Sequence, residues 1–342
     1  MRRKLNLRDR IAVLASLLAM AAIAMSSSAV AQSGESAKAR ARAESFPAKP
    51  VRIVIGLAPG GATDIVARAL AQKLTESLGQ PVIVDNRAGA AGSIAAALVA
   101  KSPADGYTLL IVSSSYAINP GLYSDLPFDP VRDLAPIMLI AEAPFLLVVN
   151  PALPAGTVKE LIALAKAQPG SLNYSSGGNG TSGHLAGELF KSLAGVTMTH
   201  VPYKGAGPAT VDVIAGQIQM TFASMVSALP HVKAGRLRAL GVTSEKRSSA
   251  LPQLPTISEA GVKGYHTGSW YGALAPAGTP ADIVGKLNAE FARVMKQPEM
   301  KARMAGEGAE PIAGTPAQFA SYLEGEIRKW GKIIRESGIR GD

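Results

Sequence analysis

Near the start of the folded region, the spacing of hydrophobic residues changes from a continuous run, typical of a buried strand, to the spacing of a helix within about thirty positions. Residues 51–57 are almost continuously apolar and rich in β-branched side chains, which predicts a buried strand of an α/β sheet. Pro and paired Gly then break the pattern over 58–61. Apolar residues recur at helical spacing from Ile65 onward, with Thr63 or Asp64 as the expected N-cap. The pattern therefore predicts a strand, a glycine-rich loop and a helix.

The same order repeats immediately. A short strand is predicted at 81–84, a second glycine-rich loop at 85–92, and a helix that Ser93 caps and that runs to about Lys101. Two helix N-termini then lie at the same edge of the sheet, where unpaired backbone N–H groups and the helix dipole favour an anion. In the alternative interpretation, the glycines only permit tight turns.

Known phosphate-binding motifs do not explain the first loop. Gly56 and Gly61 have the spacing of a P-loop, but Ala62-Thr63 stands where Lys-Ser/Thr is required, and no G-x-G-x-x-G follows the strand. The occurrence of two such loops in tandem nevertheless favours an anion site over simple turns.

The pattern continues in the same style along the chain. A third strand at 107–112 ends in three serines, irregular connections are predicted around 119–121, and two strands at 137–140 and 145–149 are separated by a break. A change to Pro and Gly near Asn150 predicts a crossing into a second lobe. There, strands alternate with short helices, which argues for a doubly wound sheet. Pro-opened helices are predicted at 280–296, 298–306 and 316–337.

In the second lobe, a short strand at 172–174 leads into the loop SSGGNGTSG at 175–183 and then a helix containing His184. This is again a strand, a glycine-rich loop and a helix start. His184 is placed to donate to a ligand oxygen, or to pack aside while Thr181 or Ser182 caps the helix. Each lobe therefore carries its own candidate anion loop.

Several segments resemble, one after another, the Bug receptors, the periplasmic solute-binding proteins of tripartite tricarboxylate transport systems. They include FPAKPVRIVIGLAPGGATDIVAR, LGQPVIVDNRAGAAGS, NYSSGGNGTSGHLAGELF and VPYKGAGPATVDVIAGQIQM, and the resemblance covers nearly everything after Ser45. It implies an α/β, two-lobed periplasmic-binding-protein (Venus flytrap, type II) fold, in which each lobe is a doubly wound sheet with flanking helices. We expect lobe one to comprise residues 46–149 and 269–342, and lobe two residues 150–268.

The N-terminus has the form of a targeting segment. Residues 1–10 carry five Lys/Arg, an apolar run of 11–25 follows, and Ala29-Val30-Ala31 supplies a cleavage site. This predicts a secretory signal peptide over 1–31, a flexible tether over 32–45 and a periplasmic mature protein. The chain has no Cys, which excludes a lipid anchor on cysteine, and no later stretch is apolar enough to embed in a membrane.

Composition narrows the function. The net charge is +10, yet only 5% of residues are aromatic and the folded region has no dense Lys/Arg run, so nucleic acid is not an expected partner. The four His have no metal-ligand spacing, and no cofactor or metal is expected. The sequence shows no motif that would pair a catalytic nucleophile with a general base, so an enzyme is not expected. A secreted hydrolase or isomerase remains the minor alternative.

Backbone N–H and hydroxyl groups are the preferred ligand groups, because they bind an anion without burying a positive charge in an empty cleft. Lys204 and Arg87 are possible neutralising cations, and Trp270 either walls the cleft or packs at the hinge. The predicted ligand-binding residues are Ala58, Pro59, Gly61, Asp64, Gly89, Ser93, Ser114, Ser176, Gly177, Thr181, His184, Tyr203 and Ser224.

The predicted function is a monomeric transport receptor that captures a small organic carboxylate for the membrane subunits of a tripartite tricarboxylate transporter. A sensory binding protein that presents the carboxylate to a signalling partner is the alternative. Ala223 stands where Bug-like sequences commonly place an Asp, so a ligand ammonium group would lack that anionic partner. A di- or tricarboxylate or an aromatic acid is therefore expected rather than an amino acid.

Overall fold

One mixed sheet of ten strands organises the chain. The computed structural model describes residues 45–306 and 308–337, so the predicted signal peptide and nearly all of the tether lie outside the described residues. From Pro47 on, the chain forms one compact unit. The strands of its sheet follow the order β2-β1-β3-β9-β4-β7-β5-β6, and β8 and β10 also pair with β4.

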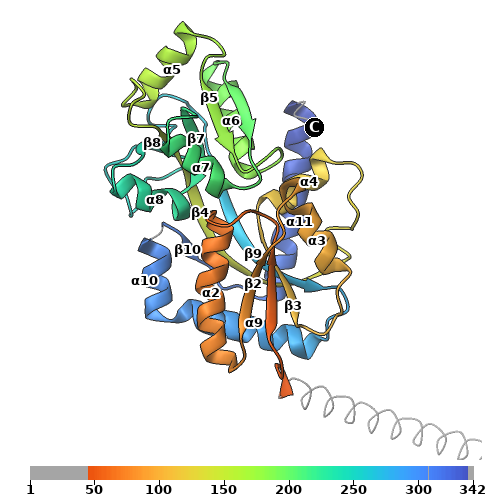
Figure 1. Ribbon diagram of the computed structural model, residues 1–342. Coiled ribbons are helices and arrows are strands. Elements are labelled where there is room, and N and C mark those ends of the chain that lie inside the picture. Colours follow the sequence, from red (N-terminus) through yellow and green to blue (C-terminus); the bar gives the residue numbers. More distant parts are fainter. Residues whose placement is uncertain (1–44, 307, 338–342) are drawn as a thin grey trace, which may run out of the picture. The chain divides into compact units, whose positions relative to one another are not determined.

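Lobe one is built on the first part of this sheet (Figure 1). Three parallel strands lie side by side, and two antiparallel strands continue the sheet toward lobe two. The parallel strands are β1 (Val51–Ile55), β2 (Val82–Asn86) and β3 (Thr108–Ser113), and the antiparallel ones are β9 (Gly268–Pro276) and β4 (Leu134–Val149), with the short β10 (Glu310–Pro311) against β4.

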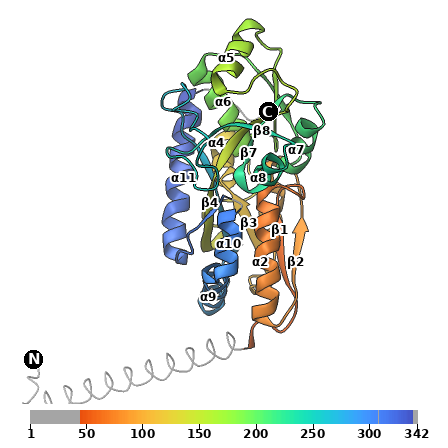
Figure 2. The same cartoon turned by 90° about the vertical axis from the view of Figure 1, so that its left-hand side faces the viewer.

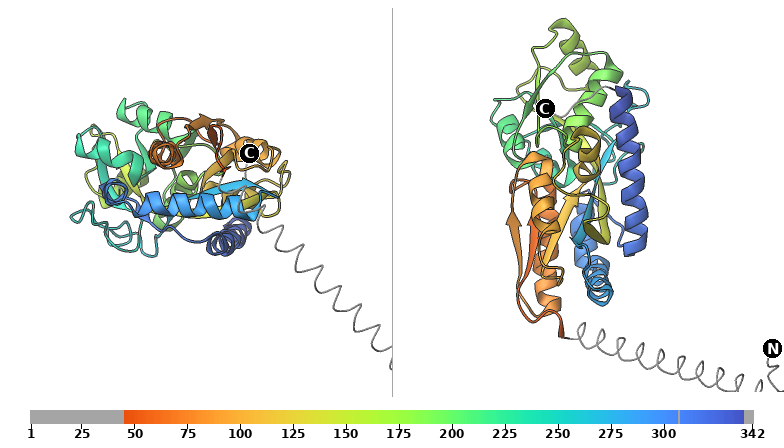
Figure 3. Two further views of the ribbon diagram at one scale, coloured as in Figure 1. Left: turned by 90° about the horizontal axis from the view of Figure 1, so that it is seen from below. Right: turned by 90° about the vertical axis from the view of Figure 1, so that its right-hand side faces the viewer.

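Helices cover both faces of the lobe-one sheet. Val54 belongs to a core shared with α3 and α11, so Ile53 and Ile55 point to the opposite face, where α2 contacts β1. Figures 2 and 3 show α2 and α11 on opposite sides of the sheet, with α9 across one end. These helices are α2 (Ala62–Leu78), α3 (Ser93–Ala100), α4 (Ser115–Leu122), α9 (Ala281–Lys296), α10 (Pro298–Gly306) and α11 (Pro316–Ser337).

Lobe two repeats this plan. Three parallel strands again lie side by side, and the second part of β4 joins them between β7 and β8. The strands are β5 (Asn173–Ser176), β6 (Thr199–Pro202), β7 (Met220–Ser224) and β8 (Arg238–Val242), and the helices are α5 (Val158–Ala167), α6 (Ser182–Ala194), α7 (Ala206–Ile214) and α8 (Met225–Lys233).

The strand β4 connects the two lobes. It pairs with β9 up to Pro144, with β7 from Phe145 and with β8 from Leu146. In lobe two its side chains alternate between two cores: Leu147 and Val149 enter the core beside α5 and α6, and Leu146 and Val148 enter the core beside α7 and α8. One continuous strand therefore contributes to the cores on both faces of the second sheet.

Four local expectations from the sequence are wrong. The two strands predicted at 137–140 and 145–149 are one strand, because the pairing with β9 continues through the predicted break. The segment 119–121 is helical within α4 although it contains Pro120. The N-cap of α2 is Gly61, without a side-chain cap, and Thr63 and Asp64 lie inside the first turn. The N-cap of α3 is likewise a glycine, Gly92, and Ser93 is the first residue of that helix.

Thr157 caps α5, with Glu160 completing a capping box. Other local expectations are confirmed. The side chain of Thr181 accepts from the His184 N–H at the start of α6. Prolines stand at or next to the first residue of α9, α10 and α11. The lobe boundaries expected from the sequence stay a prediction, although the change of strand partner at residues 144–145 falls close to the first of them.

Candidate functional site

A cavity of about 530 Å³ lies between the loops of the two lobes. Its walls come from the loops that follow β1, β2, β5 and β6, together with the C-cap residue of α4. This is the edge of each sheet where open α/β folds bind ligands. The lining residues are Leu57, Gly89, Ala90, Ala91, Tyr123, Gly177, Gly178, Asn179, Pro202, Tyr203 and Lys204.

The lobes touch each other at the rim of the cavity. The Ala58 N–H donates to the Lys204 carbonyl oxygen at 3.1 Å. The Tyr123 hydroxyl donates to the Asn179 carbonyl oxygen at 3.3 Å. The structure is thus that of a closed cleft, in which a small ligand would be enclosed by both lobes.

Buried serines join the lobes near the strands that connect them. The hydroxyls of Ser114 and Ser182 lie 2.7 Å apart, and that of Ser115 lies 3.3 Å from Ser182. Ser114 also bonds to Ser269 on β9, at 3.1 Å. Serine hydroxyls both donate and accept, so this cluster satisfies its own polar groups when the lobes meet.

Three helices begin beside the cavity without an acidic residue in their first turn: α3, α6 and α7. Each N-terminus offers backbone N–H groups and the positive end of its dipole. The N-terminus of α2 is different, because Asp64 lies in its first turn and accepts from the Gly60 N–H at 3.1 Å. The positive ends that remain uncompensated near the cavity are those of α3, α6 and α7.

Asp64 is held as a carboxylate by its neighbours. Burial raises its pKa, but hydrogen bonds from Arg68, the Gly60 N–H and Asn86 outweigh this and leave the pKa below its usual value. The carboxylate therefore organises the first glycine-rich loop and repels an anion placed directly over α2.

Backbone strain is concentrated in one wall of the cavity. Ala90 and Ala91 have φ of 46° and 48°, in the left-handed region that non-glycine residues rarely adopt. Such conformations are found preferentially at functional sites. Behind them, Asn119 donates through Nδ2 to the Ala91 carbonyl oxygen at 3.2 Å and to the Ser93 hydroxyl at 3.0 Å, which fixes the strained turn.

Lys204 is the only lining residue with a formal charge. Arg87, the other cation considered from the sequence, pairs with Asp85 at 3.0 Å and is not part of the lining. The Tyr203 hydroxyl donates to Asp212, and burial together with this carboxylate raises the Tyr203 pKa to about 12. The cavity wall is thus neutral apart from one cation.

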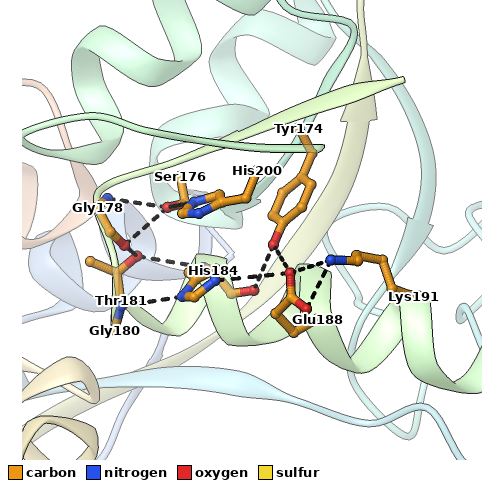
Figure 4. A network of polar contacts seen from close by, with 9 residues as sticks. All are labelled: Tyr174, Ser176, Gly178, Gly180, Thr181, His184, Glu188, Lys191 and His200. Carbon is orange, nitrogen blue, oxygen red and sulfur yellow. Dashed lines mark hydrogen bonds and ion pairs between the residues drawn. The ribbon is translucent and has the colours of Figure 1, made fainter. Parts of the chain in front are cut away.

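The lobe-two wall is supported by a polar network shown in Figure 4. The Ser176 hydroxyl lies 2.7 Å from His200 Nε2, donates to the Gly178 carbonyl oxygen and accepts from the Gly178 N–H. His184 stacks on His200 with ring centroids 4.1 Å apart. These side chains lie behind the loop and hold the backbone that lines the cavity.

The structure brings some predicted site residues to the cavity and places others behind it. Gly89, Gly177 and Tyr203 line it. Ala58, Pro59 and Gly61 lie against residues 204–207 of lobe two. Asp64, Ser93, Ser114, Ser176, Thr181, His184 and Ser224 bond to neighbouring protein groups, and the Ser224 hydroxyl contacts that of Tyr271 at 2.8 Å.

Tyr123, Asn179 and the strained Ala90-Ala91 pair were missed from the sequence. Tyr123 was not predicted because residues 119–121 of the helix α4, which ends just before it, were interpreted as an irregular connection. Trp270 packs edge-on against Phe319 and Tyr322 of α11 rather than lining the cavity.

Ala223, which stands where Bug-like sequences commonly have an Asp, was expected from the sequence to face the ligand, but it does not line the cavity. Its side chain belongs to the hydrophobic core beside α7 and α8 and is not part of the cavity lining. Selection between ligands must therefore be argued from the lining residues themselves.

Two further observations concern metal binding and membrane spans. In the part of the chain that the structure describes, no three His, Cys, Asp or Glu side chains come together as a possible metal group. Over 45–306 and 308–337, no helix combines the length and apolar character needed to cross a membrane.

Comparison with known proteins gives consistent relatives. Residues 66–339 match the family described as tripartite tricarboxylate transporter family receptor. Protein BugT of Bordetella pertussis is 38% identical over 300 residues, covering 87% of this chain and 92% of BugT. The structure of R. palustris Rpa4515 with adipate is 40% identical, with a TM-score of 0.84 and coverage of 86% and 99%. MatC from Rhodopseudomonas palustris with bound malate is 32% identical, with a TM-score of 0.80 and coverage of 84% and 100%.

Proposed function

The chain belongs to the tripartite tricarboxylate transporter receptor family of periplasmic solute-binding proteins, and we propose that it captures a small organic carboxylate without an ammonium group for uptake. The ligand lies in the cavity between the lobes. Di- and tricarboxylates and aromatic acids are the proposed class. The proposed partners, to which the protein delivers the carboxylate, are the membrane subunits of a tripartite tricarboxylate transporter.

The observation that carries this proposal is the charge of the cavity wall. The lining holds one cation, Lys204, no carboxylate, and the N-termini of α3, α6 and α7 nearby. A carboxylate is stabilised by such dipoles, whereas an enclosed ammonium group without an anionic partner would lose several kcal/mol. Structural relatives bound to adipate and malate are consistent with this class.

A thermal-shift screen of the mature protein tests the proposal. The panel pairs each carboxylate with its amino analogue, for example succinate with aspartate and glutarate with glutamate. We expect a higher melting temperature with at least one acid that lacks the amine, because a ligand that binds only the folded state stabilises it. Stabilisation by amino acids alone would contradict the proposal.

Export is the second part of the proposal. Residues 1–31 are removed and the mature periplasmic protein begins near Gln32, as the small-residue cleavage site indicates. Intact mass spectrometry of the protein from a periplasmic extract tests this. Recovery of a chain that still begins at Met1 would contradict it.

A further inference from the structure

Two histidines form a stacked pair directly behind the lobe-two loop. His184 is 8% exposed and lies in the first turn of α6, and His200 lies on β6. Their rings are 4.1 Å apart and nearly parallel, at 16°. A pair of protonated rings at this distance would repel strongly with little solvent to screen the charges. The arrangement therefore favours neutral rings.

The hydrogen bond to His184 fixes where its proton lies. The Gly180 N–H donates to His184 Nδ1 at 3.2 Å, so Nδ1 must be the acceptor and Nε2 must carry the proton. Nε2 lies 3.9 Å from the Glu188 carboxylate. A second proton on the ring would place an N–H opposite the Gly180 N–H and break the bond that holds this turn.

His200 controls the other end of the loop. The Ser176 hydroxyl donates to the Gly178 carbonyl oxygen at 3.0 Å and accepts from the Gly178 N–H at 3.1 Å. The remaining contact, 2.7 Å to His200 Nε2, is then a donation from the histidine. Together the rings hold both ends of the segment Gly177–Gly180, whose first three residues line the cavity.

The charged and titratable groups around the pair come from α6, β5, β6 and the segment before β9. From α6, Glu188 pairs with Lys191 at 2.7 Å, and from β5 the Tyr174 hydroxyl donates to Glu188 at 2.5 Å. Burial raises the Glu188 pKa, but these two partners outweigh it and keep Glu188 ionised. Burial and the neighbouring His184 lower the pKa of His200, on β6, to about 3. Tyr265, whose hydroxyl contributes to the raised pKa of Tyr174, itself has a strongly raised pKa because it is buried.

We propose that His184 and His200 are positioning residues of the binding loop: their neutral rings hold the loop in the form that lines the cavity, and a proton on His184 releases it and weakens ligand binding. This rests on the proposed carboxylate function for its consequence on affinity. The loop geometry itself does not depend on which ligand is bound.

The first measurement follows the Gly180 amide without any ligand. Protein labelled with ¹⁵N at glycine is titrated from pH 8 to pH 5.5, and the Gly180 signal and its hydrogen exchange, corrected for the intrinsic rate, are recorded. We expect protection at pH 8 that is lost with the same midpoint as the His184 ring titration. Constant protection, or loss at a different midpoint, would overturn the proposal.

The second measurement is ligand affinity by calorimetry at pH 7.5 and 5.5, with a carboxylate found in the screen. A proton that must leave before binding weakens affinity as the pH falls, so we expect weaker binding at pH 5.5 than at pH 7.5. If no carboxylate binds at pH 7.5, the proposed function fails, and the Gly180 amide alone decides the positioning role.

Variants separate positioning from simple packing. In His184→Asn, the Asn Oδ1 replaces Nδ1 as an acceptor that does not titrate, so affinity at pH 7.5 should stay within about threefold and the additional loss at pH 5.5 should disappear. Any pH dependence that comes from protonation of the ligand itself is the same in this variant and in the wild type. The difference between the two proteins therefore isolates the contribution of His184. His184→Leu has no acceptor for the Gly180 N–H, so the loop loses this hydrogen bond. The variant should bind the ligand at least about tenfold more weakly at both pH values.

The control is His266→Asn, because His266 is largely exposed and its ring is not part of the loop or the cavity lining. It should bind like the wild type at both pH values. An His184→Asn variant with the same pH dependence as the wild type, or a His184→Leu variant with unchanged affinity, would overturn the proposal.

Discussion

The Ala58 N–H and the Lys204 carbonyl oxygen lie 3.1 Å apart and join the loop before α2 to the loop before α7. The contact leaves no room for a side chain at the start of α7. A Cβ added at Gly207 would lie 2.2 Å from the Pro59 carbonyl oxygen, far inside contact distance. Gly207 thus permits the close approach of the lobes.

Gly207→Ala should therefore weaken ligand binding without unfolding the protein. Alanine is favoured over glycine by up to about 1 kcal/mol in a helix, so α7 itself should tolerate the change. We expect a loss of affinity of at least about tenfold by calorimetry, with an unchanged or higher melting temperature. Gly285→Ala is the matched control, since Gly285 lies in α9 with nothing near the added carbon. Equal affinity in both variants would show that the lobes need not meet at this point.

Ser182→Ala tests the buried serine cluster. The change removes the bonds to Ser114 and Ser115, while Ser114 keeps Ser269 and Ser115 keeps Ser113 as partners. The expected cost is about 1 kcal/mol, seen as roughly fivefold weaker ligand binding. Ser192→Ala, at an exposed position of the same helix, should bind normally. The idea that these hydroxyls support the closed form would be lost if the two variants had the same affinity.

Folding stability should fall on mild acidification because of His200. Its pKa in the folded protein is about 3, below the usual 6.5, so the unfolded chain binds the proton first. The contribution is complete above pH 6.5 and decreases as the pH falls from 6.5 toward 3. His200 is partly exposed, and after discounting for screening we expect a cost of about 1 kcal/mol at pH 5, or about 1–2 °C.

The test of this effect compares melting temperatures at pH 7.5 and pH 5 for the wild type and His200→Gln. The glutamine Nε2 can donate to Ser176 but does not titrate, so the variant should show a smaller difference between the two pH values. An identical difference in both proteins would assign the pH dependence to other groups.

Lys204→Met tests the single cation of the lining. Lys204 is exposed, so its charge acts through solvent and its contribution is modest. We expect roughly threefold to tenfold weaker carboxylate binding at low salt and a flatter dependence of affinity on ionic strength. Lys263→Met, at another exposed lysine, is the control. Unchanged affinity and salt dependence would leave the dipoles of the backbone as the main source of anion binding.

Periodicity predicted much of the fold, because the strands β1, β2 and β3 are short, mainly apolar runs that are followed by glycine or serine loops. It failed at β4, where Pro136 and Pro144 look like strand breaks but the pairing tolerates them through register shifts and the change of partner. It failed again at α4, where Pro120 within the helix concealed the residues that lead to Tyr123.

The site was harder to predict than the fold. Sequence reasoning found the loops but chose side chains such as Asp64 and Ser114, whose polar atoms bond to neighbouring protein groups. Ala90, Ala91 and Gly178 line the cavity and have no polar side-chain atoms, so only their backbone groups could hydrogen-bond to a ligand. Which backbone groups face a cavity depends on how two distant loops meet, and residue type alone carries little information about that.

Calorimetric titration of the mature protein with succinate and aspartate, and with the other acid and amino-acid pairs of the screen, tests the central claim most directly. The account predicts micromolar binding of at least one carboxylate and much weaker binding of its amino analogue, because the lining offers an ammonium group no anionic partner. Micromolar binding of aspartate or glutamate, with no measurable binding of the acids lacking the amine, would contradict it.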